Sequence, residues 1–206
     1  MPNKNQIILA SKSKYRAILL KNAGIQFTQQ AAHIDERAIE EPLLEAEMNA
    51  ADIAEILALA KATKVSDRNE NTLVIGTDQT LSFEGSLLHK PQDMEEARKR
   101  LLAFSGKSHE LNSAIAIVKN GEVLWSFVDK SVITFRELTP KFIGQHLASV
   151  GDEVLSSVGA YQIEGKGVQL FENIEGDFFS IMGLPLLPLL AQLRIINKEN
   201  IESRNN

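Results

Sequence analysis

Short apolar runs alternate with segments of helical periodicity along most of this chain of 206 residues. The run at residues 6–10 predicts a buried strand, and residues 14–23 predict a helix that ends at Gly24. A continuous apolar strand is expected again at residues 72–76. Alternation of this kind is typical of an α/β protein, so we expect a mixed twisted sheet with flanking helices.

Turn and cap signals divide the rest of the chain. Glu84-Gly85 and Asn120-Gly121 each lie between apolar runs and predict tight hairpins. Asp93 followed by Glu96 resembles a helix capping box. Further elements are expected as a strand at 25–32, a long helix from Pro42 to about Val65, a helix from Thr139-Pro140 to Gly151 and a helix at about 184–196.

Composition excludes several classes of protein. The chain has no cysteine, which rules out disulfides and thiolate metal sites, and its net charge of −5 argues against a protein that coats nucleic acid. The first apolar run is too short for a signal peptide, and the stretch 181–193 is too short for a membrane span. We expect a soluble cytoplasmic protein with no membrane partner, folded as one domain over 1–206 with a polar tail at 197–206.

Polar residues at predicted strand ends are the candidate site. Asp78 follows the strand at 72–76, where ligands gather in open α/β sheets, and a carboxylate there can hold a hard metal ion or take a proton from water. The alternative is that Asp78 only initiates a turn. Residues 11–16 join a strand to a helix N-terminus, which can bind phosphate, although a merely capped helix explains them equally well. Lys90 precedes a rigid proline that would fix its direction.

Three glycines punctuate the segment 159–167, with Glu164 and Lys166 between them. Such a segment lets the backbone approach a ligand closely, or it forms a strand with bulges. Standard phosphate-binding motifs fail, because Gly106-Lys107-Ser108 follows a helix and has Leu101 where a P-loop needs glycine.

Taken together, the motifs resemble one family. The opening Leu9-Ala10-Ser11-Lys12-Ser13-Lys14-Tyr15-Arg16 is followed, in order, by Asp35-Glu36, Ala60-Lys61-Ala62, Ile75-Gly76-Thr77-Asp78, Lys90-Pro91, Ser105-Gly106-Lys107-Ser108-His109, Gly159-Ala160-Tyr161, Glu164-Gly165-Lys166-Gly167 and Gly183-Leu184-Pro185-Leu186. This order is similar to that of the Maf-like nucleoside triphosphate pyrophosphatases, and it covers nearly the whole chain.

The resemblance implies a fold with two lobes around a central cleft, shared with the inosine-triphosphate pyrophosphatases. It implies cleavage of a nucleoside triphosphate to the monophosphate and pyrophosphate with Mg²⁺ or Mn²⁺, and it makes a homodimer possible. By position, Asp78 corresponds to the proton acceptor and a metal ligand, and Glu36 to a metal-associated carboxylate. The residues that correspond to triphosphate-binding positions are Ser11, Arg16, Lys61 and Lys90.

Three positions of the family bear on the nucleotide, and they correspond here to Tyr15, Gln79 and Glu164. Gln79 and Glu164 agree with the branch that handles 7-methyl-GTP, and Tyr15 keeps an aromatic ring where that branch has Trp. A methylated guanine is cationic, which suits a carboxylate and an aromatic face. The alternatives are the dTTP- and UTP-preferring branch, or a nucleotide-binding regulator of cell division in which hydrolysis is incidental.

The chain departs from the family pattern at two places. Lys14 and Tyr15 replace a Pro-Arg pair of the opening motif, and Leu111-Asn112-Ser113-Ala114 replaces Val-x-Thr-Gly after His109. The first departure alters the loop expected at the phosphates, and the second alters one wall of the expected cleft.

Overall fold

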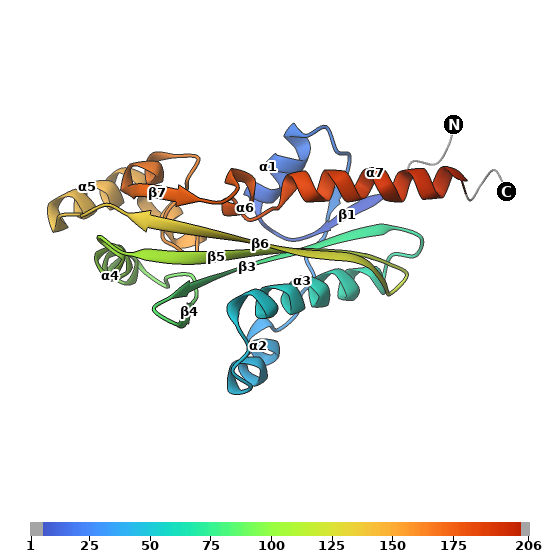
Figure 1. Ribbon diagram of the computed structural model, residues 1–206, viewed down its shortest axis with the longest axis horizontal. Helices are drawn as coiled ribbons and strands as arrows, with labels where there is room; N and C mark the ends of the chain where they lie inside the picture. Colours follow the sequence, from blue (N-terminus) through green and yellow to red (C-terminus); the bar gives the residue numbers. More distant parts are fainter. Residues whose placement is uncertain (1–5, 203–206) are drawn as a thin grey trace.

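The computed structural model describes residues 6–202, with side chains up to residue 198. Its centre is one mixed sheet of seven strands in the order β2-β1-β3-β5-β6-β7, with β4 paired to β3 (Figure 1). The strands are β1 (Ile7–Ala10), β2 (Thr28–Gln29), β3 (Leu73–Phe83), β4 (Ser86–Leu88), β5 (Ser108–Lys119), β6 (Glu122–Phe135) and β7 (Phe171–Glu175). β1 runs parallel to β2 and β3, and the other pairs are antiparallel.

Helices cover both faces of the sheet, which confirms the predicted α/β class. The helices are α1 (Lys14–Asn22), α2 (Glu36–Glu45), α3 (Ala50–Ser66), α4 (Met94–Phe104), α5 (Pro140–Val150), α6 (Phe178–Ile181) and α7 (Leu186–Glu202), with short 3₁₀ helices at Gly151–Ser156 and Lys166–Leu170. In Figure 1, α1 and α7 lie on one face of the β1 half of the sheet, and α3 lies on the other. No helix in the described part of the chain has the length and apolar character to cross a lipid bilayer.

Three hydrophobic clusters account for this arrangement. The first packs apolar residues of α1 and α7 on one face of β1, β3 and β5, where Leu9 and Ile75 are fully buried. The second packs the small residues of α3 on the opposite face. The third joins α4 and α5 to the far ends of β3, β5 and β6 around Phe104 and Phe135. Because the clusters share one sheet, the division into two lobes stays a prediction.

The local turn and cap signals are confirmed. Both residues of each predicted hairpin turn, Glu84-Gly85 and Asn120-Gly121, have positive φ angles, as a two-residue hairpin turn requires. The side chain of Asp93 accepts a hydrogen bond from the Glu96 N–H at 2.8 Å and caps α4. Gly24 also has a positive φ angle immediately after the end of α1.

Four predictions about elements were wrong. The long helix from Pro42 is two helices, because Asp35 caps α2, which begins six residues before Pro42, and Asn49 caps α3 after a break. The strand expected at 25–32 is reduced to β2. The segment 159–167 forms turns and the start of a 3₁₀ helix, which excludes the bulged strand. The helix expected to end at about residue 196 continues as α7 to residue 202, within the predicted polar tail, whose last residues, 203–206, lie outside the described part.

Candidate active site

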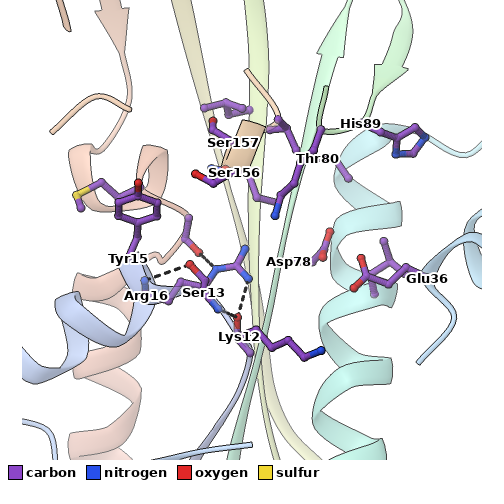
Figure 2. Close-up of a pocket in the computed structure, with 18 of the residues that line it drawn as sticks. Lys12, Ser13, Tyr15, Arg16, Glu36, Asp78, Thr80, His89, Ser156 and Ser157 are labelled. Carbon is purple, nitrogen blue, oxygen red and sulfur yellow. Dashed lines mark hydrogen bonds between the residues drawn. The ribbon is translucent and has the colours of Figure 1, made fainter. Parts of the chain in front are cut away.

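A cavity of about 910 Å³ opens beside the centre of the sheet. Its walls come from the β1–α1 loop, α2, α3, the middle of β3, the loop after β4 and the segment 156–164. All of the residues singled out from the sequence line this cavity, namely Ser11, Tyr15, Arg16, Glu36, Lys61, Asp78, Gln79, Lys90 and Glu164. Figure 2 shows the Arg16 guanidinium on one side of the cavity and the carboxylates of Asp78 and Glu36 on the other.

Asp78 lies in the middle of β3, not at its end as the sequence suggested. β1 pairs with β3 only as far as Ala10, which is opposite Gly76, whereas the pairing of β3 with β5 continues past Asp78. The apolar run that predicted the strand therefore covers only the part of β3 that is buried between neighbours on both sides. Asp78 sits just beyond the carboxyl end of β1, which gives it a cavity on one side and a rigid ladder on the other. This position excludes the alternative that Asp78 only initiates a turn.

Lys61 joins two carboxylates inside the cavity. Its Nζ atom lies 2.5 Å from Oδ1 of Asp78 and 2.9 Å from Oε1 of Glu36. Lys61 and Asp78 are buried, with 8% and 7% of their surfaces exposed, whereas Glu36 at the first turn of α2 is exposed. A buried ammonium and carboxylate need such pairing, because each would otherwise lose its hydration without compensation.

Close packing of α3 on β3 brings Lys61 to Asp78. A Cβ atom at Gly76 would lie 2.1 Å from the carbonyl oxygen of Ala58 and 2.7 Å from the Cβ of Ala62, so only glycine fits at this position of the strand. Ala58, Lys61 and Ala62 are three and four residues apart and therefore share one face of the helix. Because Ala58 and Ala62 are small, α3 packs close to β3, and the side chain of Lys61 can reach Asp78.

The β1–α1 loop is organised around Arg16. Ser11, at the end of β1, accepts hydrogen bonds from the Ser13 N–H and from Nη1 of Arg16, each at 3.2 Å. The guanidinium also donates to the carbonyl of Gly183 at 2.8 Å and to that of Thr77 at 3.3 Å. Burial lowers the pKa of Arg16, while the negative charges of Asp78 and Glu36 raise it. The result is a fixed cation beside the N-terminal turn of α1, whose positive dipole end also attracts anions.

Lys90 supplies a second cation from the opposite loop. Although Lys90 is an exposed residue, desolvation lowers the pKa of its ammonium. The nearby charges of Arg16 and Lys61 lower this pKa further, and those of Glu36 and Asp78 oppose the shift. Pro91 after it is buried. The guanidinium of Arg100 on α4 donates to the carbonyl of His89 and, at 2.5 Å, to that of Val158, which ties the Lys90 loop to another wall of the cavity.

The residues expected to face the base come from separate elements. The Tyr15 hydroxyl donates to Oε1 of Glu153 at 2.8 Å, and the Lys14 ammonium pairs with the same carboxylate. Gln79 is half-buried on β3 and follows Asp78 in the chain. Its side chain donates a hydrogen bond to the hydroxyl of Ser113 on β5. Glu164 is exposed on the segment 156–164.

The glycines of 159–167 have a local role that the sequence did not suggest. A Cβ atom at Gly159 would meet the ring of Tyr161 at 2.2 Å, and one at Gly167 would meet the backbone of Gln162 at 2.4 Å. These two glycines let the segment fold tightly on itself. Glu164 is thereby presented from a compact loop.

Sequence reasoning missed Glu40 and His89, which also line the cavity. Nε2 of His89 lies 3.2 Å from Oε1 of Glu40, and burial, together with the charges of Asp78 and Glu36, raises the pKa of Glu40 against the opposing effect of His89. Glu40 follows Glu36 by four residues, so recognition of α2 would have placed both on one helix face. The misplaced start of that helix hid this signal.

The cavity brings together groups that could bind a polyphosphate and a divalent cation. The cations of Arg16, Lys61 and Lys90 and the helix N-terminus could offset phosphate charge, and Asp78 and Glu36 offer carboxylate oxygens. No group of three His, Cys, Asp or Glu side chains within the described residues forms a metal cage. Mg²⁺ is normally bound by one or two carboxylates together with substrate phosphate oxygens and water, so the two carboxylates of this cavity fit a magnesium ion that arrives with a polyphosphate.

Comparisons with known proteins agree with this geometry. Residues 6–196 match the family model described as "Maf-like protein". The chain is 56% identical over 189 residues to a 7-methyl-GTP pyrophosphatase of Brucella suis biovar 1 (strain 1330), an alignment covering 92% of this chain and 95% of the relative. It is 56% identical over 191 residues to a protein of the same name from Mesorhizobium japonicum (strain LMG 29417 / CECT 9101 / MAFF 303099), covering 93% and 96%.

One solved structure shows a weaker likeness. A HAM1 protein from Coxiella burnetii aligns with a TM-score of 0.37 and 18% identity, covering 64% of this chain and 73% of that one. At this level of similarity no conclusion about the fold or the site rests on it.

Proposed function

The chain belongs to the Maf-like family, and we propose that it is a nucleoside triphosphate pyrophosphatase that hydrolyses 7-methyl-GTP to 7-methyl-GMP and pyrophosphate. The observation that carries the reaction is the buried Asp78, held by Lys61 across the cavity from Arg16. The relatives that share about half of its residues over more than nine-tenths of the chain support the substrate. The runner-up substrates are dTTP and UTP.

In the mechanism, the oxygen of a water molecule attacks the α-phosphorus while Asp78 accepts a proton from that water. The bond between the α-phosphorus and the bridging oxygen breaks, and its electron pair leaves with pyrophosphate. Arg16 and Lys90 neutralise charge on the triphosphate, and Lys61 holds the Asp78 and Glu36 carboxylates in place. A divalent cation, Mg²⁺ or Mn²⁺, would be held by Asp78 and Glu36 and would offset charge on the phosphate oxygens.

The base end of the cavity favours a cationic purine. Glu164 is an exposed carboxylate without an ion pair among the described residues. Glu153 holds the Tyr15 hydroxyl, and the Lys14 ammonium lies over one face of the Tyr15 ring, 4.9 Å from its centroid, so it is the other face that would meet the base. A ring that carries the positive charge of 7-methylguanine gains from both, whereas a neutral pyrimidine gains little. The regulator hypothesis has no separate support in the geometry, because binding alone does not need a buried carboxylate aimed at a triphosphate.

The test is pyrophosphate release by the full chain with Mg²⁺ and 7-methyl-GTP, GTP, ITP, dTTP or UTP. Asp78→Asn should lower kcat by about 10²- to 10⁴-fold, the usual contribution of a general base. Asp67→Asn, an exposed aspartate outside this cavity, is the matched control and should leave kcat unchanged. Tight nucleotide binding without turnover would refute the enzyme and favour the regulator.

Substrate preference is tested separately. Glu164→Gln should lower kcat/KM for 7-methyl-GTP more than for dTTP, because the carboxylate interacts with the methylated base alone. Glu172→Gln, an exposed glutamate on β7 that does not line the cavity, should change neither value. Equal losses for the two nucleotides, or faster turnover of dTTP or UTP by the unmodified chain, would overturn the 7-methyl-GTP assignment.

A further inference from the structure

The side-chain amide of Gln79 is held by three acceptors. Its Nε2 atom donates to the hydroxyl of Ser113 at 2.8 Å and to the carbonyls of Ser180 and Ile181 at 3.1 Å each. The Ser113 hydroxyl has one hydrogen, which it donates to the Ser180 carbonyl at 2.5 Å. Its oxygen can therefore face Gln79 only as an acceptor, so all three contacts require the nitrogen side of the amide.

The origin of these acceptors is structural. Ser113 is fully buried and lies directly opposite Gln79 in the pairing of β5 with β3. Ser180 and Ile181 end the short helix α6, and the Ser180 carbonyl also accepts a hydrogen bond from the Gly183 N–H at 2.8 Å. Gln79 supplies hydrogen bonds to that helix end, and Ser113 joins the same carbonyl to the sheet. Ser113 does not line the cavity and lies behind Gln79.

The contacts leave the amide oxygen of Gln79 for a ligand. No hydrogen bond to that oxygen forms within the described residues, and Gln79 lines the cavity. On its pairing edge a guanine ring offers two adjacent donors, N1–H and the N2 amino group, whereas adenine offers an acceptor at N1 and a donor only at its N6 amino group. An amide whose oxygen is presented favours the first pattern, and a buried polar mismatch penalises the second.

We propose that Ser113 is a positioning residue that, together with the carbonyls of Ser180 and Ile181, fixes the orientation of the Gln79 amide, and that this orientation selects guanine-type bases over adenine. The inference rests on the proposed function and concerns a wall of the same cavity. It also gives a role to Ser113, which lies within one of the two departures from the family pattern. A hydroxyl is the part that matters, so threonine should serve in its place.

The test compares kcat/KM for 7-methyl-GTP, GTP and ATP in the full chain. Ser113→Ala should lower the GTP-to-ATP ratio by about fivefold, the worth of one net hydrogen bond, and leave the ratio of 7-methyl-GTP to GTP unchanged. Ser113→Thr should restore the GTP-to-ATP ratio. Ser66→Ala, which removes another buried hydroxyl that accepts a hydrogen bond from the Gly121 N–H outside this cavity, should change neither ratio.

A double variant separates positioning from a general loosening of the fold. Gln79→Met should itself lower the GTP-to-ATP ratio, and adding Ser113→Ala should lower it no further, because the two residues act through one amide. The inference would be overturned if Ser113→Ala left the GTP-to-ATP ratio unchanged, or if it lowered the GTP-to-ATP and 7-methyl-GTP-to-GTP ratios equally. Additive losses of the GTP-to-ATP ratio in the double variant would also overturn it. If the unmodified chain hydrolysed none of the three nucleotides, the proposed function itself would fail instead.

Discussion

The contact between α3 and β3 allows a sharp test of how packing controls the site. Gly76→Ala would place a Cβ atom 2.1 Å from the Ala58 carbonyl oxygen, and that oxygen would have to withdraw by about 1 Å to reach the 3.0 Å that real Cβ atoms respect. The neighbour is backbone in the middle of a helix of 17 residues, so no side chain can turn aside. The whole helix must shift, and Lys61 must shift with it.

The expected cost follows from that geometry. Overpacking typically costs about 1–3 kcal/mol, and we expect about 3 kcal/mol because the contact involves backbone. For a chain of this size, that loss lowers Tm by about 6–12 °C. A displacement of Lys61 by about 1 Å from Asp78 should also lower kcat by at least about tenfold in the folded enzyme, since misplacements of this size can cost up to about 10²-fold.

Thermal unfolding and pyrophosphate release, the latter measured well below Tm, test the two effects. Gly144→Ala is the matched control, because Gly144 is exposed on α5 with nothing within 4 Å of a new Cβ atom. Alanine is the better helix former by about 1 kcal/mol, so Gly144→Ala should raise Tm by about 2–4 °C without changing kcat. A Gly76→Ala variant with the Tm and kcat of the unmodified chain would refute the reasoning.

Three further predictions concern buried titratable groups, each measured by denaturant unfolding. Lys61→Met leaves Asp78 buried without its cation and should lower the free energy of unfolding by about 3 kcal/mol at pH 7; a loss below about 1 kcal/mol would contradict the ion-pair argument. Burial lowers the pKa of His109 from 6.5 to about 3. The stability that neutral His109 contributes is therefore complete above pH 6.5. As pH falls from 6.5 toward 3, the free energy of unfolding decreases by about 1.4 kcal/mol per pH unit. His109→Gln should remove that slope, and a persistent slope would assign it to other groups. The pKa of Glu40 is raised above 4.5, mainly by burial, so its favourable contribution exists below pH 4.5 and disappears as pH rises through the folded-state pKa. Glu40→Gln should therefore be more stable than the unmodified chain at pH 8 but not at pH 4, and a gain of equal size at both would argue against titration of Glu40.

Prediction from the sequence succeeded where the determining interactions are local. The turns at Glu84-Gly85 and Asn120-Gly121 and the cap at Asp93 depend on residues within a few positions of one another, so their chemistry is visible in the chain itself. The family motifs also identified residues that line one cavity, although Lys61 and Asp78 lie within α3 and β3 rather than at their ends. Their individual roles in the reaction remain predictions.

Prediction failed where local signals compete or where the partner is distant. The periodicity of α3 and the apolar residues of α2 merge into one pattern, and Pro42 marks a plausible start, yet Asp35 and Asn49 cap two separate helices. The apolar run before Asp78 indicated a strand end, because the sequence does not show that β5 continues beside β3 after β1 has ended.

The amino-acid sequence alone determined the alternation of helices and strands, the hairpins and the set of polar residues available for chemistry. The tertiary structure decided which of these residues meet. Lys61 reaches Asp78 because Gly76 admits α3 to the sheet, and Ser113 orients Gln79 because β5 and the end of α6 converge behind it. These contacts join residues 17 to 67 positions apart, and their geometry depends on the packing of whole elements, which no local pattern encodes.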